Sequence, residues 1–404
     1  GVSVALVALP MLLLGGLPPL LVQAARPAPD DDAPGALGRL SGQLSAAGTL
    51  GSLAGTFGAA LVLLPALGTR ATFDLAAAAL LVTALLAALA RRARRAAGLA
   101  AASLVALLAL ARRPVAWTPS RPGERVVWTG ESRYNHIRVV ERGGERQLRL
   151  NDGFAVQSYV RLDGQAAPRD VWAYYALGPT WGTAPAPGRV LLLGLGGGTS
   201  ARVYRQLYPA AEVVGVELDG AVVEAGQRFL GLSPSDARVV VADARPFVEA
   251  EGERAPGSYD VIVLDAFQFP YVPFQLTTRE FFAAVRRCLA PGGVLVVNAG
   301  RYGEERAVVH ALARTLASVF THVQSADPPG NRSNTILVAT DHDPARARGG
   351  SGLAVSDATA AALRDLALRL PPPRPASWPP DAPRLTDDHA PVEWLTDRIV
   401  WKSL

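Results

Sequence analysis

Apolar and polar residues are arranged differently in the first quarter of the chain and in the rest. The first quarter contains four long apolar segments, 2–22, 46–67, 71–90 and 96–111. A membrane-spanning helix needs about 20 such residues. Segment 71–90 meets this requirement with Asp74 as its only charge. We therefore expect residues 1–116 to form the transmembrane helices of an integral, multi-pass membrane protein.

Two of these segments allow a second interpretation. Residues 2–22 could be the remnant of a signal peptide, although their prolines and the lack of a basic start weigh against it. Residues 96–111 are marginal in length for a span. The arginines within 91–95 predict a cytoplasmic loop, so the rest of the chain lies outside if 96–111 spans the membrane and inside if it does not. Because the first residue is Gly rather than Met, the natural chain can begin upstream.

Beyond Trp117 the pattern is that of a soluble domain. Residues 125–162 alternate between apolar and polar around Gly143 and Gly144, which predicts short antiparallel strands with a hairpin. After Pro187, apolar strands alternate with helices, an order that implies an α/β fold with a doubly wound parallel sheet. The strands are RVLLLGLG, AEVVGVE, RVVVAD, YDVIVLD and GVLVVNA, and the helices begin near residues 200, 220, 246 and 277.

The pattern divides the chain into four parts. These are transmembrane helices over 1–116, a β-hairpin region over 117–170, the doubly wound domain over 171–345, and a C-terminal helix and tail over 346–404. A further strand is expected over 335–340. Thr277 and Glu280 have the spacing of a capping box, which predicts a helix start at this point.

Composition excludes several classes of protein. The 404 residues are 50% hydrophobic with a mean hydropathy of +0.19, which is too apolar for an ordinary soluble protein. The net charge is +5, but the arginines are scattered and form no basic aromatic stripe for nucleic acid. A single cysteine, Cys288, excludes a disulfide framework and a cysteine zinc site. His136 and His389 have no partner at metal-ligand spacing, so we assign no metal.

The strand ends carry the candidate chemistry. In a doubly wound sheet, ligands bind at the carboxyl ends of the strands, where a Gly-rich turn leads into a helix. Here that turn is GLGGGTS, which contains Gly194, Gly196 and Gly198. Glu217 ends the next strand, where a carboxylate can accept both ribose hydroxyls. Asp243 and Asp265 end the third and fourth strands, and three acids at successive strand ends predict a nucleoside site.

The identity of the nucleoside follows from two positions. A dinucleotide fingerprint requires Gly as the sixth residue of the turn, and this chain has Thr199 there. Asp243, in VVADA, has no role in that fingerprint but can accept from the exocyclic amine of adenine in a methyltransferase-like, Rossmann-like fold. The residues therefore favour an S-adenosyl ligand over NAD.

At these motifs the sequence resembles the polyamine aminopropyltransferases, or spermidine synthases. The matching segments are ESRYNHIRV, LRLNDGFAVQS, VLLLGLGGGTSARV, VVGVELD, VVADARPF and YDVIVLDAF. The apolar segment from GRLSGQL to LPALGTR is similar to the membrane segment of the bacterial fused, transporter-like spermidine synthases, and so are DAFQFPYVPFQLTTREFF and LTDDHAPVEWLTDR.

The resemblance implies a reaction and a set of site residues. The donor is decarboxylated S-adenosylmethionine, used as a co-substrate, and the acceptor is a polyamine such as putrescine. The implied donor-binding residues are Gly194, Gly196, Gly198, Glu217, Asp243, Ala244 and Asn135. The implied acceptor-binding residues are Tyr134, Asp152, Gln157 and Tyr271. A homodimer is implied by analogy with soluble members.

The sequence departs from this family on the amine side. The family's catalytic base is the second Asp of a D-x-x-D stretch, and Gln268 stands there; its amide can orient an amine but cannot take its proton. Asp265, the first acid of that stretch, remains as the alternative base. Gly197 replaces an Asp of the Gly-rich turn. Asp387, Asp388 and Glu393 in the tail are candidates for compensation, or else form a solvated strap.

These departures leave alternatives open. An S-adenosylmethionine-dependent methyltransferase is favoured by the missing acid at Gly197, because that acid would repel the carboxylate of methionine. A non-catalytic nucleoside- or polyamine-binding protein is suggested by Gln268. Because S-adenosyl donors are made in the cytoplasm, we expect the synthase domain on the cytoplasmic side of the bacterial cell membrane.

Overall fold

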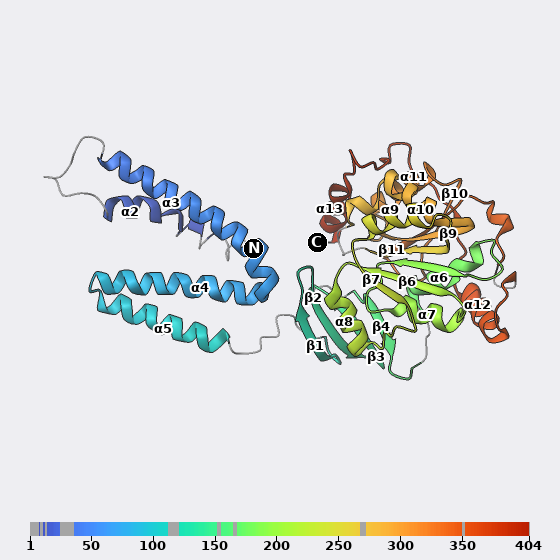
Figure 1. Cartoon of the computed structure of the whole chain (residues 1–404), viewed down its shortest axis with the longest axis horizontal. Coiled ribbons are helices and arrows are strands. Elements are labelled where there is room, and N and C mark those ends of the chain that lie inside the picture. The colour runs from blue at the N-terminus through green and yellow to red at the C-terminus, as the bar shows by residue number, and fades with distance from the viewer. Residues whose placement is uncertain are drawn as a thin grey trace. The chain divides into compact units, whose positions relative to one another are not determined.

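The protein was analysed as a computed structural model, and its chain separates into two compact units, Gly1–Ala116 and Trp117–Leu404. The structure describes residues 8, 11–12, 14–24, 36–111, 121–151, 155–164, 168–266, 272–349 and 352–403, with no side chains given for residues 36 and 398–403. Each unit is considered by itself below, and Figure 1 labels their elements.

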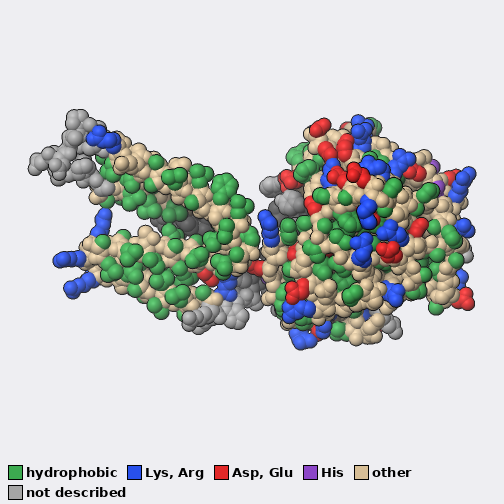
Figure 2. Space-filling model, in the orientation of Figure 1, with side chains coloured by type: hydrophobic (Ala, Val, Ile, Leu, Met, Phe, Trp, Pro, Cys, Tyr) green, Lys and Arg blue, Asp and Glu red, His purple; other side chains and the backbone are tan. Residues whose placement is uncertain are grey.

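The first unit consists of helices with mostly exposed apolar side chains. Its helices are α2 (Leu17–Ala24), α3 (Ala36–Gly58), the π-helical turn η2 (Ala59–Leu63), α4 (Leu64–Ala90) and α5 (Arg94–Ala111). Figure 2 shows hydrophobic side chains over much of this unit, whereas charged side chains are spread over the second one. By length and composition, two helical runs among the described residues could cross a membrane, Leu37–Ala90 and Arg94–Ala111.

Gly68 interrupts the longer of these runs. Its dihedral angles, φ 78° and ψ 172°, are not helical and fall in a region that is open mainly to glycine. The break lies between the apolar segments 46–67 and 71–90. Beyond it, the guanidinium of Arg70 donates to the carbonyl oxygen of Leu110 at 2.8 Å, which ties α4 to the last turn of α5.

The second unit begins with a small antiparallel sheet, as the alternating pattern predicts. Its strands are β1 (Arg125–Glu131), β2 (His136–Arg142), β3 (Glu145–Leu150) and β4 (Ser158–Arg161), paired in that order. The expected hairpin lies between β2 and β3, where Gly143 and Gly144 have φ angles of 58° and 77°. Two successive positive φ values are the requirement of a type I′ turn, which explains both glycines.

The main sheet has the strand order β12-β10-β11-β9-β8-β5-β6-β7. Its strands are β5 (Arg189–Leu193), β6 (Glu212–Glu217), β7 (Arg238–Val241), β8 (Tyr259–Leu264), β9 (Leu289–Gly300), β10 (His322–Ala326), β11 (Asn334–Thr340) and β12 (Arg374–Pro375). β5 to β9 are parallel, which confirms the α/β prediction. The sheet is nevertheless mixed, because β11, β10 and β12 each pair antiparallel with their neighbours.

Helices cover both faces of this sheet, as Figure 1 shows. The helices are α6 (Asp170–Leu177), α7 (Thr199–Leu207), α8 (Gly220–Phe229), α9 (Ala244–Arg254), α10 (Arg279–Cys288), α11 (Ala307–Ala317), α12 (Asp357–Arg369) and α13 (Val392–Ser403), with short 3₁₀ turns η3 (Gly178–Trp181), η4 (Phe274–Leu276) and η5 (Pro344–Arg346). Along β5, Leu191 and Leu193 pack with α9, α10 and α11, whereas Val190 and Leu192 pack with α6 and α7. Burial on both faces accounts for the unbroken apolar sequence of the strand.

Two helix starts differ from the sequence prediction. Asp243 caps α9 by accepting from the Arg245 amide at 2.9 Å, so this helix begins two residues before Pro246. The predicted capping box at Thr277 is wrong, because the cap of α10 is Thr278, whose hydroxyl accepts from the amide of Phe281. The hydroxyl of Thr277 instead donates to the carbonyl of Phe274.

The only cysteine, Cys288, ends α10 in the core. Its side chain is buried, and the thiol donates to the carbonyl oxygen of Val248 at 3.5 Å. Burial, with a smaller contribution from Glu251, raises the pKa of this thiol to about 11. Cys288 is therefore a packing residue of the core and not a reactive thiol.

Helix α8 packs directly on the Gly-rich turn after β5. A Cβ atom on Gly226 would lie 2.9 Å from the Cα of Gly197 and 3.1 Å from its carbonyl oxygen, and neither backbone atom can move aside. A Cβ on Gly220, at the start of the same helix, would meet Val241 at an ordinary 3.6 Å.

We expect Gly226→Ala to lower the free energy of unfolding by about 1–3 kcal/mol, the usual cost of forcing a methyl group into a packed contact. The matched variant Gly220→Ala should be neutral or slightly stabilising, because alanine favours helix. Chemical denaturation of the full chain in detergent measures both. Equal stability of the two variants would contradict the close packing of α8 on the turn.

Candidate active site

A pocket opens at the carboxyl ends of the parallel strands. β5 lies between β6 and β8, so the helices after β5 and β8 leave on opposite faces and open a crevice at this edge. Nine predicted site residues line it: Tyr134, Asn135, Gln157, Gly194, Gly196, Glu217, Asp243, Ala244 and Asp265. Gly198 does not line it, but caps α7 with a φ of 87°. Asp152, Gln268 and Tyr271 lie outside the described residues.

Glu217, the last residue of β6, holds the Gly-rich turn. Its Oε2 accepts from the amide of Gly196 at 2.8 Å and its Oε1 from the amide of Asp219 at 3.2 Å. Burial raises the pKa of Glu217, and these two amides oppose the rise. The carboxylate is therefore fixed in orientation beside the turn, where a vicinal diol can donate to it.

Asp243 and Ala244 follow β7 on the same edge. One oxygen of Asp243 accepts from the Arg245 amide, so the carboxylate serves as a helix cap while it also lines the pocket. Ala244 is the first residue of α9 and is nearly buried. The carboxylate of Asp243 and the amino terminus of α9 therefore lie together at this edge of the pocket. A carboxylate there can accept a hydrogen bond from an amino group on the edge of a purine base.

Asp265 follows β8 at the floor of the pocket. Its Oδ1 accepts from the side-chain amide of Asn298, on β9, at 2.8 Å. Burial raises the pKa of Asp265 to about 6, the charge of Glu217 adds to the rise, and Asn298 and Tyr175 oppose it. The hydroxyl of Tyr175, on α6, is buried and lowers the pKa of Asp265, although no hydrogen bond of normal geometry joins the two groups. Asp265 is thus a carboxyl group whose pKa lies well above that of an ordinary aspartate and below neutral pH.

The turn after β5 approaches Asp265 closely. Gly194 has a φ of 92°, and a Cβ at this position would lie 2.3 Å from the carbonyl oxygen of Asp265. Any side chain at Gly194 would therefore displace the strand end that carries Asp265. This contact explains the predicted glycine as a packing requirement of the site.

Asp219 is a site residue that the sequence analysis missed. It is 2% exposed and caps α8 by accepting from the amide of Ala221 at 3.0 Å. Its other oxygen accepts from the hydroxyl of Ser132 at 2.5 Å and from the side-chain amide of Asn135 at 2.8 Å. Asp219 thereby joins the small sheet to the main sheet. Its position before a helix, in VELDG, is an N-cap signal that could have identified it.

Strand β4 is fastened over the Gly-rich turn. The hydroxyl of Ser158 accepts from the amide of Gly197 at 2.8 Å. The hydroxyl of Thr199 accepts from the amide of Tyr159 at 2.7 Å and donates to the carbonyl of the same residue at 2.8 Å. Thr199, which breaks the dinucleotide fingerprint, therefore joins the two sheets where a dinucleotide site would have glycine.

Gly197 faces this junction and not the pocket. A Cβ at Gly197 would lie 3.0 Å from Leu230, 3.1 Å from Ser158 and 3.4 Å from Leu148. The sequence analysis treated this glycine as a lost acid that removes a charge from the amine site. In this structure, a side chain here would enter the packed contact between the small sheet and α8.

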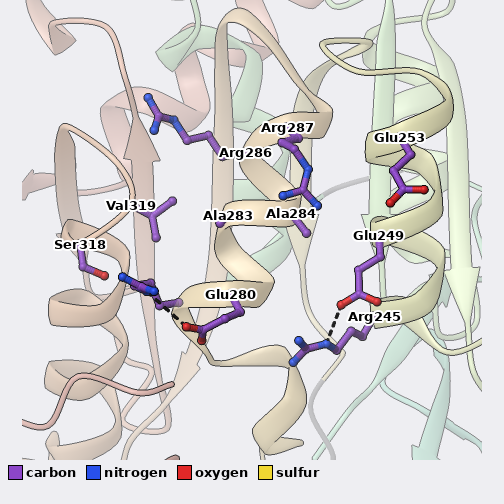
Figure 3. A pocket seen from close by; sticks show the side chains of 11 residues that line it. Arg245, Glu249, Glu253, Glu280, Ala283, Ala284, Arg286, Arg287, Ser318 and Val319 are labelled. Carbon is purple, nitrogen blue, oxygen red and sulfur yellow. Dashed lines mark hydrogen bonds and ion pairs between the residues drawn. The ribbon is translucent and has the colours of Figure 1, made fainter. Parts of the chain in front are cut away.

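The acids of the tail do not line the pocket. Arg245 forms a bidentate ion pair with Asp387, with nitrogen–oxygen distances of 2.7 and 2.6 Å. This pair holds the pKa of the Asp387 carboxyl below its usual range. Figure 3 shows the separate groove between α9 and α10, where Arg245 also pairs with Glu249 and Arg279 pairs with Glu280. Asp387 is therefore paired with Arg245 outside the pocket, which favours a strap over a role in amine binding for this residue.

Comparison with known proteins gives consistent matches. Residues 180–327 match the spermine/spermidine synthase domain family. A probable polyamine aminopropyl transferase of Bifidobacterium longum is 35% identical over 221 residues, 53% of this chain and 47% of the relative. A polyamine aminopropyltransferase of Vibrio vulnificus is 34% identical over 156 residues, 38% of this chain and 51% of the relative. The chain spans about half the length of these curated relatives.

Among solved structures, a probable spermidine synthase from Corynebacterium glutamicum aligns with a TM-score of 0.47 and 24% identity, covering 63% of this chain and 98% of that one.

The raised pKa of Asp265 predicts a pH dependence of stability. Below about pH 4 the carboxyl is protonated in both the folded and the unfolded chain and costs nothing. Between about pH 4 and the folded pKa of about 6, the unfolded chain loses this proton first, so stability falls as pH rises. The full cost, about 3 kcal/mol, applies above that range.

As the pH rises from about 4 to about 7, the free energy of unfolding of the Asp265→Asn variant should therefore fall less than that of the natural protein. Thermal unfolding of both full chains in detergent across this range measures the difference. Parallel curves would show that Asp265 does not titrate in this range.

Proposed function

Because the chain carries a spermine/spermidine synthase domain, we propose that it is a polyamine aminopropyltransferase. The reaction transfers the aminopropyl group of decarboxylated S-adenosylmethionine to a polyamine such as putrescine. The observation that carries the proposal is the meeting of Glu217, Asp243 and Asp265 in one pocket beside the Gly-rich turn. The three carboxylates differ in their surroundings, and each suits a different part of this reaction.

Two of the carboxylates recognise the donor nucleoside. Glu217 accepts from the two ribose hydroxyls, because the amides of Gly196 and Asp219 already hold it in place. Asp243 accepts from the adenine amine, and Ala244 lies against the base. Gly194 and Gly196 let the donor approach the backbone of the turn, and Gly198 and Asn135 support this wall of the pocket.

The third carboxylate takes the proton. A primary alkylamine has a pKa of about 10 and arrives protonated, so a base must free its lone pair. The amine nitrogen then attacks the methylene carbon beside the sulfonium. The new carbon–nitrogen bond forms, the carbon–sulfur bond breaks, and sulfur keeps the electron pair as a neutral thioether. Asp265 is our candidate for this base, because its pKa of about 6 leaves it ionised at neutral pH.

The acceptor amine is assigned to the side of the pocket formed by Tyr134 and Gln157. An aromatic face and a side-chain amide can both hold an alkylammonium. The resemblance adds Asp152 and Tyr271 to this group and gives Gln268 an orienting role. The methyltransferase alternative is weakened, because Gly197 faces Leu230 and Ser158, so its lack of a carboxylate removes no charge from the pocket.

We further propose that the first unit anchors the enzyme in the membrane by several spans, as in the fused, transporter-like spermidine synthases. The support is the exposure of its leucines. Leu80 is 58% exposed and Leu86 is 61% exposed, on a helix long enough to span. Gly68 breaks the helix between two apolar segments. Lipid would cover the apolar surface that water otherwise contacts.

The full chain in detergent should bind decarboxylated S-adenosylmethionine more tightly than S-adenosylmethionine in a calorimetric titration, and putrescine should strengthen that binding. Glu217→Ala should weaken donor binding about 5- to 150-fold, which corresponds to about 1–3 kcal/mol for unpaired ribose hydroxyls. Glu212→Ala, at the exposed start of the same strand, should leave affinity unchanged. Tighter binding of the intact donor, with indifference to putrescine, would move the protein to the methyltransferases.

Membrane anchoring can be tested with two exposed leucines. Leu80→Arg should reduce the fraction of full-length chain that stays with membranes after alkaline extraction, because a charge at the centre of a span costs about 3 kcal/mol. Leu368→Arg, at a position 88% exposed in the second unit, should not change that fraction. Complete extraction of the natural chain would exclude an integral anchor.

A further inference from the structure

A line of three side-chain amides leads from Asp265 to the protein surface. Asn298, on β9, donates to Oδ1 of Asp265 at 2.8 Å and is 8% exposed. Its own oxygen accepts from the amide of Asn334, on β11, at 2.9 Å. The oxygen of Asn334 accepts from the amide of Asn331 at 3.1 Å.

The direction of this line is fixed at its outer end. The side-chain oxygen of Asn331 accepts from two backbone amides, those of Ser333 at 2.7 Å and Asn334 at 3.0 Å. A backbone amide can only donate, so Asn331 must keep its oxygen toward the backbone and its NH₂ group toward Asn334. Each amide then orients the next, and Asn298 is obliged to present its NH₂ group to Asp265.

We infer that Asn331, Asn334 and Asn298 form a directed relay of positioning residues that reserves one oxygen of Asp265 as a hydrogen-bond acceptor. The proton taken from the substrate amine then goes to the other oxygen. None of the three lines the pocket, so they act through Asp265 and not on the substrate. The inference deepens the proposed function, because it assigns the orientation of the base.

The other groups that act on Asp265 come from two further elements. Glu217, on β6, raises its pKa through charge repulsion, and Tyr175, on α6, lowers it. Asn298 lowers it as well, because its NH₂ group stabilises the ionised carboxylate. The relay therefore opposes the effects of burial and of the charge of Glu217 on the pKa of Asp265, and it favours the ionised carboxylate.

The relay can be reversed without a change of shape. In Asn334→Asp, the new carboxylate can only accept, so Asn298 must turn its NH₂ group toward it and present its oxygen to Asp265. Only a protonated Asp265 can donate to that oxygen. The pKa of Asp265 should then rise by about 1 unit or more. Asn334→Ala removes the bond but leaves Asn298 free to donate to Asp265, so the rise should be much smaller.

The readout does not depend on activity. For each variant, thermal unfolding of the full chain is compared with that of the same variant carrying Asp265→Asn, and the pH midpoint of the difference reports the titration of Asp265. Ser333→Asp is the matched control for charge, because it adds a carboxylate next to Asn334 at an exposed position outside the relay. Asn298→Ala removes the donor itself and should raise the midpoint by a second route.

A midpoint that rises in Asn334→Asp and Asn298→Ala but not in Ser333→Asp or Asn334→Ala supports the relay. Equal shifts in Asn334→Asp and Ser333→Asp would reduce the effect to added charge, and unchanged midpoints in Asn334→Asp and Asn298→Ala would overturn the inference. If the natural chain transfers aminopropyl groups, the acid limb of its pH profile for kcat/KM should move with the midpoint. If the natural chain does not transfer aminopropyl groups, the proposed function fails, and the unfolding data still test the relay.

Discussion

The close approach of backbone segments around the turn after β5 is the constraint on which the rest of the second unit depends. Gly194 allows the end of β8 to lie against the turn, and Gly197 and Gly226 bring α8 onto it without intervening side chains. The backbone amides of Gly196 and Gly197 donate hydrogen bonds to Glu217 and Ser158, respectively. The same few contacts thus set the position of Asp265, the place of α8 and the docking of the small sheet.

At the rim of the pocket, hydrogen bonds join the two sheets. Asp219 caps a helix of the main sheet and also receives Ser132 and Asn135 from the small one. Thr199 makes two hydrogen bonds to the backbone of Tyr159. Because such bonds depend on geometry, they fix the distance between the walls of the pocket more narrowly than a sliding apolar contact would.

The sequence allowed the parallel strands and the acids at their ends to be predicted, because apolar runs, helix starts and a Gly-rich turn are local signals. The antiparallel strands β10 and β12 were missed, since β12 has only two residues and β10 is only half-buried. The contact of Asn298 with Asp265, and of Asn334 with Asn298, could not be predicted, because it depends on neighbouring strands that are distant in the chain. The role of Thr199 was hidden for the same reason.

The single cysteine has a practical consequence. Thiol reagents attack the thiolate, and Cys288 is both enclosed in the core and held protonated at neutral pH. The folded natural chain should therefore not react with maleimides. A cysteine introduced into the arginine-rich turn between α4 and α5, or at the end of α5, would be the only labelled site. With the first unit inserted in a membrane as proposed above, reagents that cannot cross a bilayer would then report on which side each of these points lies.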